Sequence, residues 1–336
     1  MVVRSVAMAA IGIGLVSCGS ELSGSSSRAR TAGPERLHVV TTVAPITSIA
    51  AAVIGDHAEI TGIVPEGTNS HTFEPRPSDA EALENADVVF VNGLQLEEPT
   101  KQLAEEVTTD RTPLVELADV TATEDEWIYD FSFPEKAGKP NPHLWTNPPM
   151  AKRYAEIIRD EMIELDPDNE ADYTANAAAF GDQVDEFDRA LRAAFATILP
   201  ENRKLLTYHD AYAYFAEDYG FEVIGAIQPS TFDDPTPAEV IALITQVREA
   251  GVPAVFGSEV FPSPVLEQIG READVRYVDV LRDDDLPEGP GDPEHSWFGL
   301  MRFDYRTITE ALGGDPAALD ALDTTPSVTD EARYPQ

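Results

Sequence analysis

The sequence predicts an α/β protein with two lobes, each with a mostly parallel β-sheet flanked by helices, joined by one long rigid α-helix. Two observations support this fold class. Short β-branched segments alternate with amphipathic segments along most of the 336 residues, as in parallel sheets whose strands are connected by helices. Between the two alternating halves, residues 168–199 carry apolar side chains at intervals of three and four, which indicates one face of an uninterrupted helix.

The expected long helix is bounded by Pro167 and Pro200. At about 1.5 Å for each residue it would extend roughly 45 Å, which is longer than a small domain is wide. Its predicted buried face comprises Tyr173, Ala177, Phe180, Val184, Phe187, Leu191, Ala194 and Ile198. A coiled-coil partner helix is the weaker alternative, because only about four heptads are present and the two alanines are small for a helix–helix contact. We therefore expect this helix to connect two bodies.

In the N-terminal half, strands are expected where β-branched and aromatic residues form short apolar runs. The predicted strands are 37–43, 58–64, 87–92 and 113–117, and the predicted helices are 45–54, a short helix from residue 78, 94–107 and 149–165. Ser78 and Glu81 have the spacing of a capping box at the start of the short helix. Residues 119–142 break the alternation with acids, aromatics and prolines, and a loop of that length without its own elements is usually functional or disordered.

The C-terminal half also alternates strands and helices, although no convincing sequence repeat relates the two halves. The predicted strands are 204–208, 221–227, 253–256 and 275–280, and the predicted helices are 211–219, 237–250, 264–273 and 297–312. Thr236 and Glu239 form a second capping box, with Pro237 at the first helical position. The expected segments are a lipoprotein signal peptide (1–17), a flexible tether (18–36), an N-terminal lobe (37–167), the connecting helix (168–199), a C-terminal lobe (200–314) and a tail (315–336).

The N-terminus has the pattern of an exported lipoprotein. Residues 1–17 carry one charge, Arg4, and an apolar run over 6–16 that is too short to span a bilayer as a mature helix. The tetrapeptide Leu-Val-Ser-Cys that ends at Cys18 resembles a bacterial lipobox, in which the cysteine is lipidated; Val16 is a tolerated rather than typical residue there. A plain secretory signal is the alternative. Cys18 is the only cysteine, so no internal disulfide can stabilise the fold.

The charge of the chain excludes one class of partner. The formal net charge is −38, with 61 Asp and Glu against 23 Lys and Arg. Recognition of nucleic acid or of an anionic membrane surface needs basic residues that are scarce here. The acidic surface suits solubility and a cationic ligand, but it selects no particular cation.

Three of the six histidines lie at loop or strand-end positions, and they come from both halves of the chain. They are His71, His143 and His209. Ligands of parallel sheets bind outside the carboxyl ends of the strands. Asp279 lies in a similar position near the end of the last predicted strand, and Glu259 is a competing carboxylate. Three imidazoles and one carboxylate would satisfy four-coordinate zinc, and His and Asp are also acceptable to manganese.

The other three histidines have less constrained contexts. We expect His38 to be an alternating strand residue and His57 to lie in a turn. His295 lies in an acidic loop, where we expect it to be solvated rather than to act as a ligand.

Four stretches of the sequence resemble the solute-binding lipoproteins of bacterial zinc and manganese ABC transporters. They are Asn69-Ser70-His71-Thr72-Phe73-Glu74-Pro75, Asn141-Pro142-His143-Leu144-Trp145, Tyr208-His209-Asp210-Ala211-Tyr212 and Tyr277-Val278-Asp279-Val280-Leu281. The resemblance covers residues 37–312, including the long helix. It implies that His71, His143, His209 and Asp279 bind one divalent ion per chain between the lobes, with Asp279 favoured over Glu259 as the fourth ligand.

The resemblance also implies a function, a location and partners. The protein would be a monomeric receptor without catalytic residues that delivers the ion to the permease of an ABC transporter. It would lie outside the cytoplasm, lipid-anchored through Cys18 to the outer face of the cytoplasmic membrane or periplasmic. In this family Glu instead of His at the third ligand position tends to accompany manganese, so His209 favours Zn²⁺. Many zinc members have a His-rich acidic loop before the second ligand, and residues 119–142 contain no histidine, which leaves Mn²⁺ open.

Two other classes of function are compatible with parts of the sequence. A secreted zinc-dependent hydrolase can also use three protein ligands, with water in the fourth position. However, the sequence contains neither H-E-x-x-H nor G-x-S-x-G, and a ligand at Asp279 would fill the open position. A surface adhesin is compatible with a lipid-anchored exterior location. For the receptor, the rigid helix should limit lobe opening, so we expect local motion of residues 119–142 or of the C-terminal lobe instead of wide hinge closure.

Overall fold

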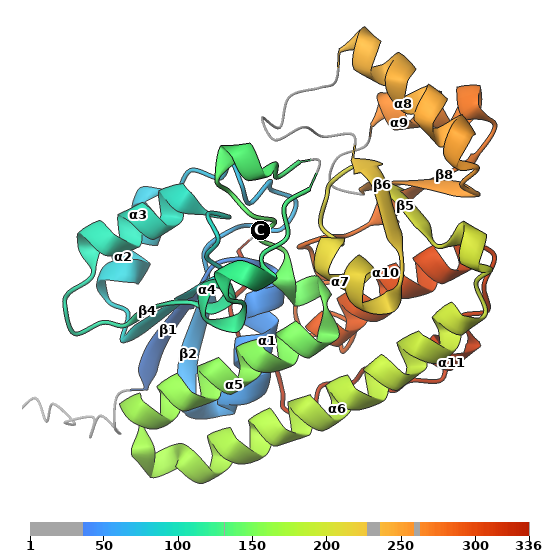
Figure 1. The fold of residues 1–336 in the computed structure, drawn as a ribbon. Coiled ribbons are helices and arrows are strands. Elements are labelled where there is room, and N and C mark those ends of the chain that lie inside the picture. The colour runs from blue at the N-terminus through green and yellow to red at the C-terminus, as the bar shows by residue number, and fades with distance from the viewer. Residues whose placement is uncertain (1–35, 131, 227–235, 259–262, 336) are drawn as a thin grey trace, which may run out of the picture. The chain divides into compact units, whose positions relative to one another are not determined.

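The computed structural model describes residues 36–130, 132–226, 236–258 and 263–335, which belong to one compact unit (Figure 1). The predicted signal peptide, the tether with Cys18, and Glu259 lie outside these residues. Within the described part, no helix is both long enough and apolar enough to cross a membrane.

Two four-stranded sheets form the framework, and every strand pairing within them is parallel. The strands are β1 (Leu37–Thr41), β2 (Ala58–Gly62), β3 (Val88–Val91), β4 (Leu114–Glu116), β5 (Lys204–Thr207), β6 (Glu222–Ala226), β7 (Ala254–Ser258) and β8 (Arg276–Leu281). The strand orders are β2-β1-β3-β4 and β6-β5-β7-β8. The predicted fold class of two parallel α/β lobes is therefore confirmed.

Helices connect and cover the strands in both lobes. The α-helices are α1 (Ala44–Ile54), α2 (Pro77–Glu84), α3 (Glu98–Val107), α4 (Leu117–Thr121), α5 (Pro148–Leu165), α6 (Glu170–Ala196), α7 (Ala213–Tyr219), α8 (Pro237–Ala250), α9 (Pro264–Ala273), α10 (Trp297–Ala311) and α11 (Ala317–Asp320). Short 3₁₀ turns are η1 (Gly55–His57), η2 (Glu124–Glu126), η3 (Glu135–Ala137), η4 (Leu144–Thr146), η5 (Pro167–Asn169) and η6 (Pro200–Asn202).

The long connecting helix is α6, with 27 residues. All eight residues of its predicted face are at most 5 % exposed. This face packs on α5 and α1 and also on α10, and Figure 1 shows α6 running past both sheets. Phe180 and Phe187 contact the aromatic rings of Trp297 and Phe298 on α10. The apolar periodicity therefore predicted both the helix and the face that it buries.

The buried side chains form two clusters of unequal size. The larger one is continuous from the first sheet through α1, α5 and α6 to α7 and α10, so it includes parts of both lobes. The smaller one lies between the second sheet and the helices α8 and α9. The first sheet and the inner side of the second lobe thus share one core.

Several local predictions need correction. The helix α2 begins one residue earlier than predicted, at Pro77, and the carboxylate that accepts its N-terminal N–H is Asp79, which bonds the backbone of Arg76 at 2.6 Å, and not Glu81. The reason is that the residue before a proline is held extended, so Arg76 is the cap. The helix α3 begins at Glu98 instead of residue 94, and residues 119–142 contain the end of α4 and the short turns η2 and η3.

The expectation for His295 was also wrong. Its side chain is buried, with 2 % of the residue exposed, and its Nδ1 lies 3.1 Å from the carbonyl oxygen of Pro287. The acidic loop that contains it is covered by the C-terminal residues, which include a backbone pairing of Arg333 with Thr61 on β2. Burial here comes from a segment that is far away in the sequence, which no local pattern could indicate.

Candidate metal centre

Three histidines from three separate segments converge on one point. His71 lies in the loop after β2, His143 immediately precedes η4, and His209 follows β5. Their Nε2 atoms are 3.2 Å apart for His71 and His143, 3.3 Å for His71 and His209, and 2.9 Å for His143 and His209. Among the described residues, these three histidines form a group that could hold a metal ion, because their ligand atoms all lie within 4.8 Å of one another. The structure therefore brings together the three histidines that the sequence singled out.

The local sequence explains why these side chains meet. The loops after β2 and β5 leave the carboxyl ends of strands in parallel sheets, where such folds bind ligands. His143 follows Pro142 and begins a tight turn, and its backbone N–H bonds the side chain of Asn141 at 3.0 Å. The second and third histidines are almost fully buried, at 1 % and 7 % exposure, whereas His71 is partly accessible.

Asn141 fixes the orientation of His143. Its Oδ1 lies 2.8 Å from His143 Nδ1, and an amide oxygen can only accept, so Nδ1 carries the proton and the lone pair of Nε2 is directed at the other histidines. Asn141 is itself fully buried and donates from Nδ2 to Asp130 at 2.8 Å and to the carbonyl oxygen of Asp210 at 2.6 Å. Such a partner holds a metal-binding imidazole in the required tautomer and orientation.

Burial favours the neutral form of two imidazoles of the site. It lowers the pKa of His71 and of His143 well below the usual range, and the nearby charge of His209 adds to this in both cases. Phe133 and Trp145 pack on these rings and exclude water: the Phe133 centroid is 5.7 Å from His71, and the Trp145 centroid is 5.0 Å from His143. Neutral imidazoles are the form that binds a metal ion, so the site is prepared for a cation without first losing protons.

The predicted fourth ligand is not part of this group. Asp279 lies on β8 and is exposed, and it is absent from the cluster of ligand atoms around the three histidines. Asp279 lies within the strand, whereas the three histidines lie in loops outside the strands. Its competitor, Glu259, lies outside the described residues.

Another carboxylate that the sequence analysis missed lies closer to the histidine loop. Asp284 follows the end of β8 and forms a hydrogen bond with the side chain of Ser70, the residue before His71. Burial raises the pKa of Asp284 to about 6, although the bond to Ser70 lowers it. The available signal was its position in the Asp283-Asp284-Asp285 run just beyond a parallel strand, which is where the histidines also lie.

A cavity of about 250 Å³ leads to the accessible side of His71. Its walls include Leu94, Gln95, Phe133 and Lys139. Leu94 and Gln95 have positive φ angles of 46° and 61°, a conformation that a branched residue such as leucine rarely adopts. The cavity is lined by His71 and not by the two more deeply buried histidines.

This fold and this site together define a class of protein: a two-lobed solute-binding receptor with a histidine site between the lobes. The chain belongs to the family described as "Zinc-uptake complex component A periplasmic", whose model matches residues 39–311. The resemblance inferred from the four sequence stretches is thereby confirmed.

Relatives named for different metals share most of the chain. The manganese-binding lipoprotein MntA of Halalkalibacterium halodurans is 30% identical over 296 residues, which are 88% of this chain and 93% of that protein. The iron-binding protein YfeA of Yersinia pestis is 29% identical over 279 residues, covering 83% and 87%. Among solved structures, the periplasmic zinc-binding protein TroA of Treponema pallidum matches with a TM-score of 0.75 at 23% identity, over 83% of this chain and 99% of that one. The last comparison shows the shared fold.

The family and these relatives are solute-binding receptors and not enzymes. This confirms the expectation of a binding protein over a secreted hydrolase.

Proposed function

We propose that this protein is an extracytoplasmic receptor that binds one divalent metal ion, preferentially Zn²⁺, and delivers it to the permease of an ABC transporter. The observation that carries the proposal is the convergence of three Nε2 atoms at 2.9–3.3 Å. Zinc held at about 2.0–2.1 Å by tetrahedral nitrogens would separate them by roughly 3.3–3.4 Å. The distances between the imidazoles are therefore close to those of a tetrahedral zinc site.

The donor set supports zinc over manganese. Imidazole nitrogens suit zinc, whereas manganese favours carboxylate, carbonyl and water oxygens. Three nitrogens and one carboxylate leave few oxygen donors. Manganese is the alternative cargo, because the relative MntA is named as manganese-binding and residues 119–142 contain no histidine.

For the fourth ligand we propose Asp284 in preference to Asp279. Its contact with Ser70 places a partly buried carboxylate beside the His71 loop, while Asp279 is exposed on its strand. The carboxylate would reduce the charge of the bound divalent ion inside a site that is poor in water. This choice changes the predicted ligand set at one position and keeps His71, His143 and His209.

The proposal includes the location and assembly of the protein. We propose that Cys18 carries the lipid anchor, which is supported by the lipobox-like tetrapeptide and by relatives named as lipoproteins. The receptor would act as a monomer, with the permease as its protein partner.

The test is a titration of the chain without residues 1–18 with Zn²⁺ and Mn²⁺ in competition, repeated on His209→Ala. The matched control is His38→Ala, which removes a partly exposed strand histidine on β1. We expect one zinc ion per chain, displacement of manganese by zinc, and weaker binding only in His209→Ala. Preference for manganese would identify the alternative cargo, and absence of stoichiometric binding of either ion would refute the receptor function.

A further inference from the structure

The last part of the chain crosses the molecule and returns to the first sheet. We call residues 324–335 the C-terminal strap. The family model ends at residue 311, so the strap lies beyond the part that defines the family. At its start, the hydroxyl of Thr324 donates to Glu294 at 3.1 Å, and Gln183 on α6 donates to the carbonyl oxygen of Thr325 at 3.1 Å.

The strap adds a short parallel pairing to β2, the edge strand of the first sheet. Arg333 N–H donates to the carbonyl oxygen of Ile60, and Gly62 N–H donates to that of Arg333, both at 2.9 Å. Two residues further along the strap, the carbonyl oxygen of Pro335 accepts a hydrogen bond from the N–H of Glu66 at 3.3 Å. The strap therefore ends on the loop that leads from β2 to His71.

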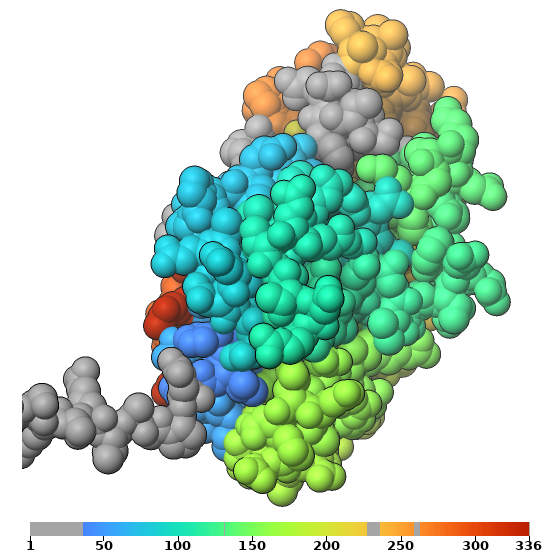
Figure 2. Space-filling view, turned by 90° about the vertical axis from the view of Figure 1, so that its left-hand side faces the viewer, coloured from blue at the N-terminus to red at the C-terminus, as the bar shows by residue number. Residues whose placement is uncertain are grey.

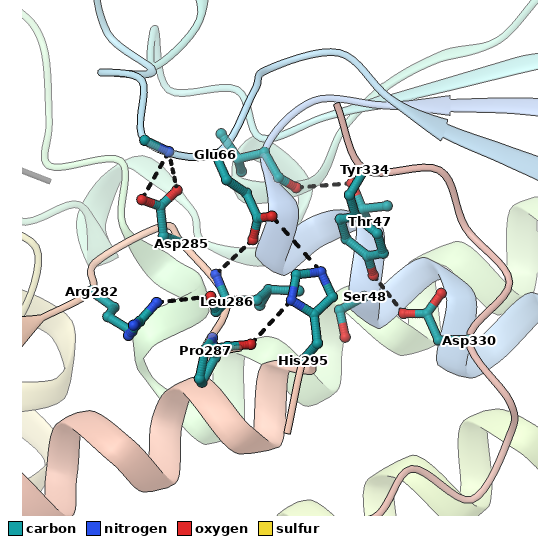
Figure 3. Close-up of polar contacts among 12 residues, drawn as sticks. Thr47, Ser48, Glu66, Arg282, Asp285, Leu286, Pro287, His295, Asp330 and Tyr334 are labelled. Atoms are coloured by element: carbon teal, nitrogen blue, oxygen red, sulfur yellow. Dashed lines mark hydrogen bonds and ion pairs between the residues drawn. The ribbon is translucent and has the colours of Figure 1, made fainter. Parts of the chain in front are cut away.

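Tyr334 anchors the strap beneath this loop. Its hydroxyl donates to Asp330, and its ring meets the ring of His295 edge-on, with centroids 4.6 Å apart (Figure 3). The Nε2 of His295 lies 3.8 Å from a carboxylate oxygen of Glu66. Tyr334 thus contacts the acidic loop that carries Asp284 through His295, and its neighbour Pro335 contacts the loop that carries His71 through Glu66.

These two segments are also tied to each other. They are residues 63–71, with His71, and residues 282–296, with Asp284. The N–H of Leu286 donates to Glu66 at 3.1 Å, and Gly67 N–H donates to both carboxylate oxygens of Asp285 at 3.0 Å (Figure 3). Residues 63–71 follow β2 of the first sheet, and residues 282–296 follow β8 of the second sheet. These bonds therefore join the two lobes next to the metal centre.

We propose that the C-terminal strap is a positioning element of the metal centre and that Tyr334 is its positioning residue. By holding residues 63–71 against residues 282–296, it keeps His71 and Asp284 at one separation and slows release of the ion. Binding groups need a supporting shell that holds them within about 0.5 Å of the required geometry, and a preordered site does not have to order its loops on binding. The inference rests on the proposed function, because the separation matters only to a receptor that holds an ion there.

The test compares two variants with the unaltered full chain. The first is Tyr334→Ala, and the second is the chain shortened so that it ends at Thr325. The readout is the rate of Zn²⁺ release into excess chelator. We expect release at least tenfold faster in both variants, which is more than the accompanying loss of stability of the metal-free protein accounts for. The matched control is Arg333→Ala, whose exposed side chain pairs with Glu59 at 3.3 Å, while its backbone makes the strap bonds; release should be unchanged.

A second measurement does not depend on metal. Amide hydrogen exchange of residues 63–71 and 282–296 in the metal-free full chain should increase in Tyr334→Ala and stay unchanged in Arg333→Ala. Unchanged release and unchanged exchange would overturn the proposal. Faster release with an equal loss of metal-free stability would also overturn it, since Tyr334 would then be only structural. If the unaltered chain binds neither Zn²⁺ nor Mn²⁺, the receptor function fails, and the exchange measurement still decides whether the strap orders these loops.

Discussion

The two lobes have the same strand order but differ in how their cores are built. In each sheet the first strand of the lobe lies between the second and third strands, and the fourth lies outside the third. The first sheet shares a continuous core with α6 and the inner helices of the second lobe, whereas α8 and α9 cover the second sheet through a separate, smaller cluster. The two lobes therefore share a topology but not a core: the large cluster continues from one lobe into the other, whereas the small cluster belongs to the second lobe alone.

The difference also indicates which parts can move. Residues that contact the large core hold both ligand-bearing sides of the site, and α6 crosses from one lobe to the other. We expect the layer of α8 and α9, which packs on the smaller cluster, to loosen more readily than the large core. Local motion of residues 119–142 or of the C-terminal lobe remains our expectation, and a large rotation between metal-free and metal-bound crystals would contradict it.

The largest expected effect is a loss of stability when a buried side chain of either core is shortened. Phe180→Ala on α6 opens a cavity in the shared core and should lower the free energy of unfolding by about 3–5 kcal/mol. Ile269→Ala on α9, in the small cluster, should cost about 2–5 kcal/mol but should raise amide exchange only around α8 and α9. Zinc affinity of Ile269→Ala should stay within about twofold of the unaltered protein. Exchange that increases across both lobes in Ile269→Ala would show that the cores are not separate.

The next effect concerns the carboxylate that the second lobe supplies. Asp284→Asn should weaken zinc binding by about 100-fold or more, which is about 2.7 kcal/mol, because it removes the charge beside His71. The matched variant Asp279→Asn changes an exposed carboxylate on the same chain segment and should alter affinity by less than about twofold. Isothermal titration of both variants decides between the two positions, and the reverse ranking would restore Asp279 as the ligand.

A smaller effect is expected at the residue that orients His143. Asn141→Ala removes the acceptor of Nδ1–H and should weaken zinc binding by about 10- to 100-fold. Asn69→Ala serves as the control, because Asn69 accepts from the backbone N–H of His71 and not from its ring. A larger loss in Asn69→Ala than in Asn141→Ala would mean that loop conformation matters more than ring orientation.

The smallest effect is a dependence on pH. The folded-state pKa of His143 lies well below 6.5, so as pH falls below about 6.5 the unfolded chain takes up a proton that the folded chain does not. The metal-free protein should therefore lose up to about 1.4 kcal/mol of stability for each pH unit below 6.5 through this group, and His71 shifts in the same direction.

Glu97 changes the free energy of unfolding in the opposite direction as pH falls, so its contribution can be distinguished from that of His143. Burial raises its pKa to about 6, so it favours the folded state as pH falls from 6 towards 4.5. Urea unfolding of metal-free His143→Gln and Glu97→Gln between pH 7 and pH 5 measures each contribution. A loss of stability below pH 6.5 that is identical in His143→Gln and the unaltered chain would exclude the histidine as its cause.

Much of this protein was decided by local patterns in the sequence. The eight buried residues of the predicted face, seven of them in α6, repeat with the helical period, α9 has the predicted bounds, and the Thr236 and Glu239 cap forms as expected. The three histidines could be selected because they lie at loop or strand-end positions, and His71 and His209 follow strands of parallel sheets, where ligands bind. In each case the signal lies within a few neighbouring residues.

The tertiary structure alone decided the remaining features. The repeated strand order left no visible sequence repeat, since the two sheets bury different side chains in unequal cores. The approach of Asp284 to Ser70 and the burial of His295 under Tyr334 both depend on contacts between segments more than 30 residues apart. Local propensity contains no information about such contacts, because their free energy is gained only when distant segments have already been brought together by the core.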